Sequence, residues 1–325
     1  MTYLGDASLP RRLLRSLAGL VRRPKGSQGQ SHAVWVIGHR GAARQAPENT
    51  LASFRKALDL GADAIETDVC ITQDGCFVLW HDAEPSESVA LVRQAGAEGS
   101  YLYLPALPAL GSDLRRPVRE CEKALFLEHY GYTLADKGFE SSLGGARRPE
   151  VPPALLEDLL DWAPGEPRLK HVFLDLKPPV QQKEKVVRLL RLVSDRVRRP
   201  DHRPDLTYHL LEAQREIVSA LLAETERAPA PDAVRVTGDF ELPGVVRGAR
   251  KHGFVHVAMG LGRRTWGDFR HEAGRVVRAR RRGLVASVVA WTVNDEDRLR
   301  ELVALGIDGI VTDEPALLRD IAGSR

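Results

Sequence analysis

Eight short runs of strand-forming residues alternate with helical periods along most of the chain. The runs lie at residues 34–37, 64–69, 172–176, 206–210, 233–237, 255–259, 284–293 and 309–312. Eight strand–helix units are the number that a closed (β/α)8 barrel requires, so the sequence predicts an α/β protein with a TIM barrel. An open, doubly wound sheet would also alternate strands and helices. Against that alternative, no glycine-rich nucleotide fingerprint follows the first strand.

The alternation is interrupted once, between residues 83 and 150. A hairpin turn at Gln73-Asp74-Gly75 precedes this segment, so the insertion should begin at the C-terminal end of the barrel strands. It is long for a connection, and we expect either a lid over the substrate or an irregular segment packed on the rim. The predicted organisation is an N-terminal extension, residues 1–32, and one barrel domain, residues 33–325, which contains the insertion.

Three carboxylates fall where they can meet at one end of the predicted barrel. Glu66 and Asp68 are two residues apart on the second strand, and alternation along a strand puts them on the same side. Asp175 ends the third strand. Three carboxylates at close range repel one another unless a cation lies between them. Oxygen ligands suit Mg²⁺ or Ca²⁺, so we expect a divalent metal site made of these three residues.

Two histidines and two cations also lie at strand ends. His39 follows the first strand and His81 follows the hairpin, and an imidazole can accept or donate a proton near neutral pH. Either histidine alone would more often be structural, but the pair beside a carboxylate cluster indicates acid–base catalysis. Arg40 can clamp phosphate oxygens with its planar guanidinium. Lys177, two residues after Asp175, can neutralise phosphate oxygens from the same face.

Two further positions could line a substrate pocket. Glu48 lies in the loop after the first strand and could orient Arg40 or a substrate hydroxyl. Trp291 ends the seventh strand, where it could wall the pocket, contact a choline or alkyl group, or pack in the core. Asn49 and Thr50 are expected to cap the helix that follows them.

These residues stand in motifs that resemble the glycerophosphodiester phosphodiesterase family. The matching pieces are His39-Arg40-Gly41, Pro47-Glu48-Asn49-Thr50, Gly61-Ala62-Asp63, Glu66-Thr67-Asp68-Val69 and His81-Asp82, and more weakly Phe173-Leu174-Asp175-Leu176-Lys177, Ala290-Trp291-Thr292-Val293-Asn294 and Asp308-Gly309-Ile310-Val311-Thr312-Asp313. The resemblance implies a TIM-barrel enzyme of lipid and glycerol metabolism. Such an enzyme hydrolyses glycerophosphodiesters to glycerol phosphate and an alcohol with a divalent metal, and its catalytic pair would be His39 and His81. Members usually carry Glu where Asp175 stands.

Two other functions remain open at this stage. A lipid phosphodiesterase similar to sphingomyelinase D or a lysophospholipase D would share the barrel, and Asp175-Leu176-Lys177 resembles its third-ligand strand. The intact Pro47-Glu48-Asn49-Thr50 and the lack of a cysteine pair in the loop after His81 favour the first function. A catalytically inactive barrel that binds lipid phosphates is the non-enzyme alternative. The presence of both histidines and all three carboxylates argues against it.

Composition and the N-terminal segment bear on partners and location. A formal net charge of +3 over 325 residues does not suggest a nucleic-acid binder. Leucines recur at helical spacing among five arginines in residues 9–23, which predicts a basic amphipathic helix that either packs on the barrel or contacts a membrane surface. Residues 24–32 resemble a linker. Arg15 interrupts the apolar centre that a secretory signal would need, so we expect a cytoplasmic protein, with membrane association as the further option.

Overall fold

The computed structural model describes residues 33–135, 148–241, 244–262 and 265–323. The helix predicted for residues 9–23 and the linker at residues 24–32 lie outside the described residues. So does the part of the insertion at residues 136–147.

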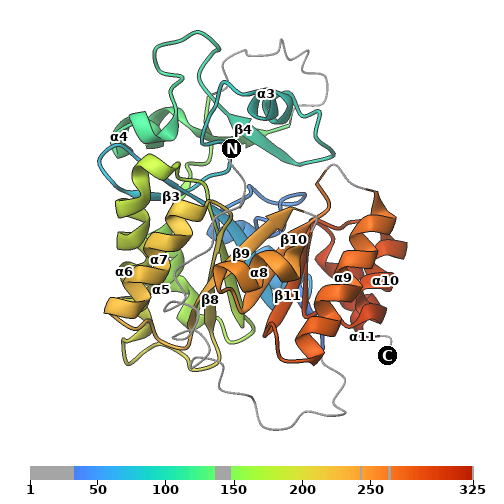
Figure 1. Ribbon diagram of the computed structural model, residues 1–325. Coiled ribbons are helices and arrows are strands. Elements are labelled where there is room, and N and C mark those ends of the chain that lie inside the picture. Colours follow the sequence, from blue (N-terminus) through green and yellow to red (C-terminus); the bar gives the residue numbers. More distant parts are fainter. Residues whose placement is uncertain (1–32, 136–147, 242–243, 263–264, 324–325) are drawn as a thin grey trace.

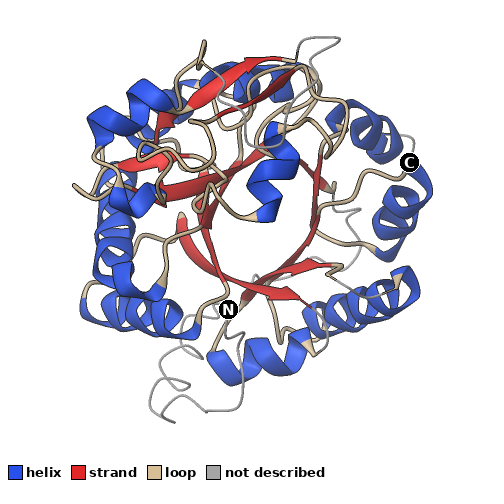
Figure 2. Cartoon of the chain, turned by 90° about the horizontal axis from the view of Figure 1, so that it is seen from above, coloured by secondary structure: helices blue, strands red, loops and turns tan. Residues whose placement is uncertain are grey.

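Eight parallel strands form a closed barrel. In chain order they are β1 (Trp35–Gly38), β2 (Ala64–Ile71), β7 (His171–Leu176), β8 (Thr207–Glu212), β9 (Val234–Glu241), β10 (His256–Gly260), β11 (Ser287–Trp291) and β12 (Gly309–Thr312). Each strand pairs with the next, and β1 pairs with both β2 and β12, which closes the ring. Figure 2 shows this ring from above, with helices arranged around its outside and part of the chain lying over its opening. The predicted TIM barrel is confirmed, and the alternative of an open, doubly wound sheet is wrong.

Eight helices surround the barrel in the described part of the chain. They are α2 (Leu51–Asp59), α5 (Leu156–Trp162), α6 (Lys183–Val197), α7 (Arg215–Arg227), α8 (Val245–His252), α9 (Trp266–Arg281), α10 (Glu296–Leu305) and α11 (Pro315–Gly323). Their apolar residues recur at helical spacing: in α6, Val186, Leu189, Leu190 and Val193 are all buried. These faces pack on the outside of the strands and form the main core. Short 3₁₀ turns, η2 (Ala163–Gly165) and η3 (Val180–Gln182), precede β7 and α6.

The insertion is a packed structure with a core of its own. The chain leaves β2 through β3 (Phe77–Leu79), which pairs antiparallel with it, and returns through β6 (Ala154–Leu155). Between them lie α3 (Ser88–Gln94), β4 (Tyr103–Ala106), η1 (Val118–Glu120), α4 (Lys123–His129) and β5 (Gly131–Leu134), with β4 and β5 paired. Trp80 packs edge-on against Phe126 and Tyr130 at ring-centroid distances of 5.8 and 6.3 Å. Figure 1 places α3, β4 and α4 above one end of the barrel.

Three histidines lie inside the barrel near the start of its strands. His171 begins β7 and His256 begins β10, while His209 lies on β8 between them. His209 Nε2 is 3.3 Å from His171 Nδ1, and its ring stacks on Phe173 at 4.2 Å. Burial lowers the pKa of His171 to about 4 and that of His256 to about 3, and it holds the pKa of His209 well below the ordinary value. All three are therefore neutral at pH 7.

These histidines predict a loss of stability in mild acid. An unfolded histidine binds a proton near pH 6.5, whereas the folded ones do not, so the free energy of unfolding should fall as pH drops from 6.5 towards 4. Each histidine contributes a slope of about 1.4 kcal/mol per pH unit. The free energy of unfolding, measured with urea at several pH values, should depend less steeply on pH in the double variant His209→Gln with His256→Gln. The exposed His271→Gln serves as the control, and equal slopes in wild type and double variant would contradict the assignment.

Candidate active site

Two neighbouring strands bring the three predicted carboxylates together. The register pairs Asp68 on β2 with Asp175 on β7, and Glu66 lies two residues before Asp68 on the same face. One carboxylate oxygen from each of the three lies within 4.8 Å of the others. Among the described residues this is the only cluster of His, Cys, Asp or Glu side chains with such geometry. Its donors are all carboxylate oxygens, which fit Mg²⁺ or Ca²⁺ better than zinc.

The charges around this cluster are partly balanced by Lys177. Its Nζ lies 3.0 Å from Asp68 Oδ1 and 2.5 Å from Asp175 Oδ2. Burial alone would raise the pKa of Asp68, but Lys177 and Arg40 lower it well below its usual range. Burial, followed by the charges of Asp68 and Asp175, raises the pKa of Glu66 well above its usual range. A further positive charge at Glu66 would therefore be favourable, which agrees with a cation site.

Arg40 lies beside the cluster and is held on several sides. Its backbone N–H donates to Glu66 Oε2 at 3.0 Å, and its Nη1 donates to Glu48 Oε2 at 3.0 Å. Its Nε is 3.1 Å from Asp68 Oδ2, and only 6% of the residue is exposed. The backbone of Arg40 has φ of 50°, an uncommon conformation for a residue with a side chain. Glu48 therefore contacts Arg40 directly, which is one of the two roles expected for it.

Asn49 does not cap the following helix, so that prediction is wrong. Thr50 is the N-cap of α2, and its hydroxyl accepts a hydrogen bond from the Ser53 N–H. The Asn49 side chain turns to β2 instead, where Nδ2 donates to Asp68 Oδ2 at 2.9 Å. Its Oδ1 accepts from the backbone N–H of Asp68 and from the Thr67 hydroxyl. Asn49 thus fixes the orientation of a candidate metal ligand.

His39 is paired with a carboxylate from the last strand of the barrel. It directly follows β1, and its Nδ1 lies 2.7 Å from Oδ1 of Asp313, which directly follows β12. Asn294 Nδ2 donates to the other oxygen of Asp313 at 2.6 Å. Burial would raise the pKa of Asp313, but the charge and hydrogen bond of His39 lower it to about 2. A proton on Nδ1 shared with this carboxylate leaves Nε2 of His39 for proton transfer.

His81 has the same kind of support from its neighbour. Its Nδ1 lies 2.8 Å from Asp82 Oδ1, and both oxygens of Asp82 accept from Arg93 Nε at 3.1 and 3.2 Å. Burial, and next the positive charge of Arg40, lower the pKa of His81. Burial would raise the pKa of Asp82, yet Arg93 and the His81 hydrogen bond hold it well below its usual range. His81 is therefore neutral at pH 7 and suited to accept a proton.

Trp291 lies at the barrel end, as expected, and is half-buried. Its Nε1 donates to Asp239 Oδ1 at 2.6 Å, which ties the end of β11 to β9. Its ring covers Gly260 at the end of β10, where an added Cβ would lie 2.5 Å from the indole. Glycine at this position is what lets the indole lie flat across the strand end.

Several residues of this site carried no catalytic or binding role in the sequence analysis. Asp313 directly follows β12 and Asp82 lies three residues after β3, and these positions near strand ends were the signal that could have identified them. Glu212, which ends β8, was also missed: its Oε1 accepts from the N–H groups of Ala213 and Gln214. Burial, together with the charges of Asp175 and Asp239, raises the pKa of Glu212 to about 8 against those two hydrogen bonds.

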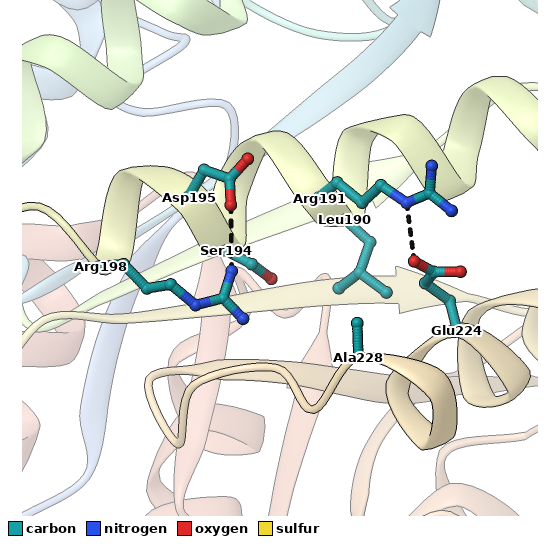
Figure 3. A pocket seen from close by; sticks show the side chains of 7 residues that line it. All are labelled: Leu190, Arg191, Ser194, Asp195, Arg198, Glu224 and Ala228. Carbon is teal, nitrogen blue, oxygen red and sulfur yellow. Dashed lines mark hydrogen bonds and ion pairs between the residues drawn. The ribbon is translucent and has the colours of Figure 1, made fainter.

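A hollow lies outside the barrel, between α6 and α7 (Figure 3). Its lining residues are Leu190, Arg191, Ser194, Asp195, Arg198, Glu224 and Ala228. Arg191 pairs with Glu224 at 2.7 Å, and Arg198 pairs with Asp195 at 3.0 Å. These residues lie on the two helices or directly after them, and they include none of the strand-end side chains. The candidate active site is therefore the C-terminal end of the barrel.

Known proteins resemble this chain in sequence around the same residues. Residues 39–115 and residues 287–316 each match a model of the glycerophosphoryl diester phosphodiesterase family. A glycerophosphodiester phosphodiesterase from Caldanaerobacter subterraneus subsp. tengcongensis is 55% identical over 47 residues, which are 14% of this chain and 19% of that protein. The alignment thus spans about a fifth of that relative's length.

Solved structures share the fold over nearly the whole chain. A structure from Silicibacter pomeroyi DSS-3, described as a glycerophosphoryl diester phosphodiesterase, is 23% identical with a TM-score of 0.66, over 96% of this chain and 97% of that one. A phosphodiesterase from Oleispira antarctica, solved in complex with the product sn-glycerol-3-phosphate, is 19% identical with a TM-score of 0.58, over 90% of this chain and 97% of that one. Both support the barrel architecture.

The Asp175 carboxylate gives a direct test of the metal site. Asp175→Asn keeps the shape and one oxygen but loses the charge, so affinity for Mg²⁺ or Ca²⁺ should fall by about tenfold or more. Asp175→Glu keeps a carboxylate one methylene longer and should retain measurable affinity. Calorimetric titration of the three proteins decides this, with the exposed Asp195→Asn as control. Unchanged affinity in Asp175→Asn would remove Asp175 from the ligand set.

Proposed function

We propose that this chain hydrolyses glycerophosphodiesters to glycerol phosphate and an alcohol, since residues 39–115 and 287–316 match models of the glycerophosphoryl diester phosphodiesterase family. The observation that carries the proposal is the arrangement at the barrel end. Two histidines, each with Nδ1 on a carboxylate, accompany a cluster of three carboxylates. Cleavage of a phosphodiester needs one group that takes a proton from the nucleophile and one that gives a proton to the leaving oxygen.

We assign those proton transfers to His39 and His81. Asp313 and Asp82 hold their Nδ1 atoms, so Nε2 is the atom of each ring that exchanges a proton with the substrate or with water. Each carboxylate also stabilises the imidazolium form that arises during turnover. The lowered pKa of His81 agrees with a residue that is neutral before the reaction.

The charged residues around the cluster are assigned to phosphate and metal. Glu66, Asp68 and Asp175 would hold a divalent cation, Mg²⁺ or Ca²⁺, which would supply positive charge beside the phosphate. Lys177 is about a quarter exposed and can reach the oxygens of a bound phosphate. Arg40 is fixed by its acidic neighbours, so its positive charge stays close to the same place.

The substrate pocket is assigned to the groups at the edge of this cluster. Glu48 positions Arg40, and Trp291 offers a half-buried aromatic face for the alcohol portion of the substrate. A choline-bearing lipid phosphodiester, the substrate type of sphingomyelinase D, is the second candidate. The Asp175 carboxylate in the cluster supports it, because Asp is the residue that relative carries there.

Turnover assays with glycerophosphocholine and with sphingomyelin separate these candidates. We expect glycerophosphocholine to be cleaved to glycerol phosphate and choline, and we expect chelation of divalent ions to abolish the reaction. A preference for sphingomyelin would favour the second candidate. No cleavage of any diester by the metal-loaded protein would favour a binding barrel.

The two histidines should each be required for that turnover. His39→Ala and His81→Ala should lower the rate by about 10²-fold or more, the usual loss for general acid–base catalysis. The double variant should lose much less than the product of the two effects, because the residues act as a unit. His271→Ala on the exposed face of α9 is the control. Wild-type turnover in either single variant would show that histidine to be wrongly assigned.

We further propose that the protein is cytoplasmic and touches membrane surfaces through residues 9–23. Five arginines lie among leucines at helical spacing in this segment, a pattern suited to anionic lipid headgroups. Within the described part of the chain, no helix is long and apolar enough to cross a membrane. Deletion of residues 1–30 should weaken sedimentation with anionic vesicles and leave turnover of a soluble diester unchanged. Equal vesicle binding by both proteins would contradict the proposal.

A further inference from the structure

Arg93 reaches the active site from the insertion. It belongs to α3, and only 3% of it is exposed. Its Nε donates to both oxygens of Asp82 at 3.1 and 3.2 Å, and its Nη2 donates to Glu48 Oε1. Its Nη1 donates to Glu98 Oε2 at 2.7 Å. One guanidinium therefore binds three carboxylates on separate edges of its plane.

The two buried partners of Arg93 each support a different functional group. Asp82 holds Nδ1 of His81 at 2.8 Å, and Glu48 holds Nη1 of Arg40 at 3.0 Å. These contacts form one path that runs from His81 through Asp82, Arg93 and Glu48 to Arg40. Basic and acidic side chains alternate along it, and Arg93 is its middle member. A displacement of Arg93 would move both ends, because each carboxylate takes its orientation from the two groups that it bridges.

Charge balance also depends on Arg93. Asp82 and Glu48 are both buried and lie close enough for Asp82 to raise the pKa of Glu48. Burial would raise the pKa of Glu48 as well, yet Arg93 first and Arg40 second lower it. Removal of one partner from a buried ion pair is strongly destabilising, because the remaining charge is left uncompensated. Arg93 is thus what allows two carboxylates to stay ionised at this place.

We propose that Arg93 is a positioning residue that fixes His81 through Asp82 and Arg40 through Glu48, so that the insertion supplies a structural part of the active site. The inference rests on the proposed function, since it gives Arg93 a role in that reaction.

Two variants and a matched control test this role. Arg93→Gln removes the charge, and Arg93→Lys keeps the charge but loses the planar fork that serves two carboxylates. We expect kcat to fall by about 10²-fold in Arg93→Gln, the size of effect that a small misplacement of catalytic groups produces, with a smaller fall in Arg93→Lys. Free guanidinium should restore part of the activity of Arg93→Gln. KM should change less than kcat, because Arg93 does not touch the phosphate site directly.

Arg115 provides the matched control. It is another buried arginine of the insertion, and it donates to Gln94 Oε1 at 2.9 Å and to the carbonyl oxygen of Pro108 at 2.7 Å. Arg115→Gln should destabilise the insertion to a similar degree but leave the pH profile unchanged. Equal losses of kcat in the Arg93 and Arg115 variants would overturn the inference, because both would then act only through stability.

The pH dependence of His81 gives a readout that a purely structural residue would not move. The charged groups that face His81 are Asp82 beside it, Arg40 and Glu48 in the loop after β1, Asp68 on β2 and Arg93 on α3. Loss of Arg93 removes a nearby positive charge and leaves His81 as the hydrogen-bond partner of the Asp82 carboxylate among the described residues, which favours the imidazolium. The pKa of His81 should therefore rise in Arg93→Gln, and the corresponding limb of the pH–rate profile should move to higher pH.

Nuclear magnetic resonance of the histidine side chains measures the same pKa without turnover. A rise of the His81 pKa in Arg93→Gln but not in Arg115→Gln is the expected result. If wild type cleaved no diester, the proposed function would fail, and this titration would still decide the placement of Arg93. An unchanged His81 pKa in a folded Arg93→Gln protein, or wild-type kcat in that variant, would overturn the inference.

Discussion

The closure of the barrel is the constraint on which the rest of this structure depends. β1 pairs with both β2 and β12, which closes the ring, and every neighbouring pair in it is parallel, so the C-terminal ends of all eight strands meet at one rim. The pairing of β1 with β12 sets His39 beside Asp313, although 274 residues separate them in sequence. The pairing of β2 with β7 sets Asp68 beside Asp175 in the same way. The chemistry of the site therefore follows from strand register.

The rim carries many buried charges, and their mutual compensation shapes the site. An isolated carboxylate in an apolar interior would be neutralised by a shift of its pKa. Here Lys177 lies between Asp68 and Asp175, and Arg40 lies between Asp68 and Glu48. This arrangement keeps Asp68 ionised despite its burial, whereas burial and the charges of Asp68 and Asp175 raise the pKa of Glu66. Because each buried charge needs an opposite charge beside it, acidic and basic side chains alternate through the site.

The sequence predicted the regular parts of the molecule better than the contacts between its loops. All eight barrel strands were found, because their apolar runs and spacing are local properties of the chain. The cluster of three carboxylates was found because Glu66 and Asp68 share a face by strand alternation, and Asp175 lies near the end of the next barrel strand. By contrast, the partnership of Arg93 with Glu48 spans 45 residues and depends on how the insertion packs. The Asn49 side chain likewise donates to Asp68 instead of capping the helix that follows it, and no local sequence pattern predicts this contact.

Histidines at the two ends of the barrel show how environment decides the role of a residue type. His171, His209 and His256 near the start of the strands contact hydroxyl groups, aromatic rings and one another, and burial lowers the pKa of each. The charged groups that also lower these pKa values are Arg235, Lys170 and the neighbouring histidines, so a proton on any of the three is disfavoured. His39 and His81 at the other end each have a carboxylate on Nδ1. Of these five histidines, the two at the rim have a carboxylate partner that could stabilise an added proton, which agrees with the proton-transfer role proposed for them.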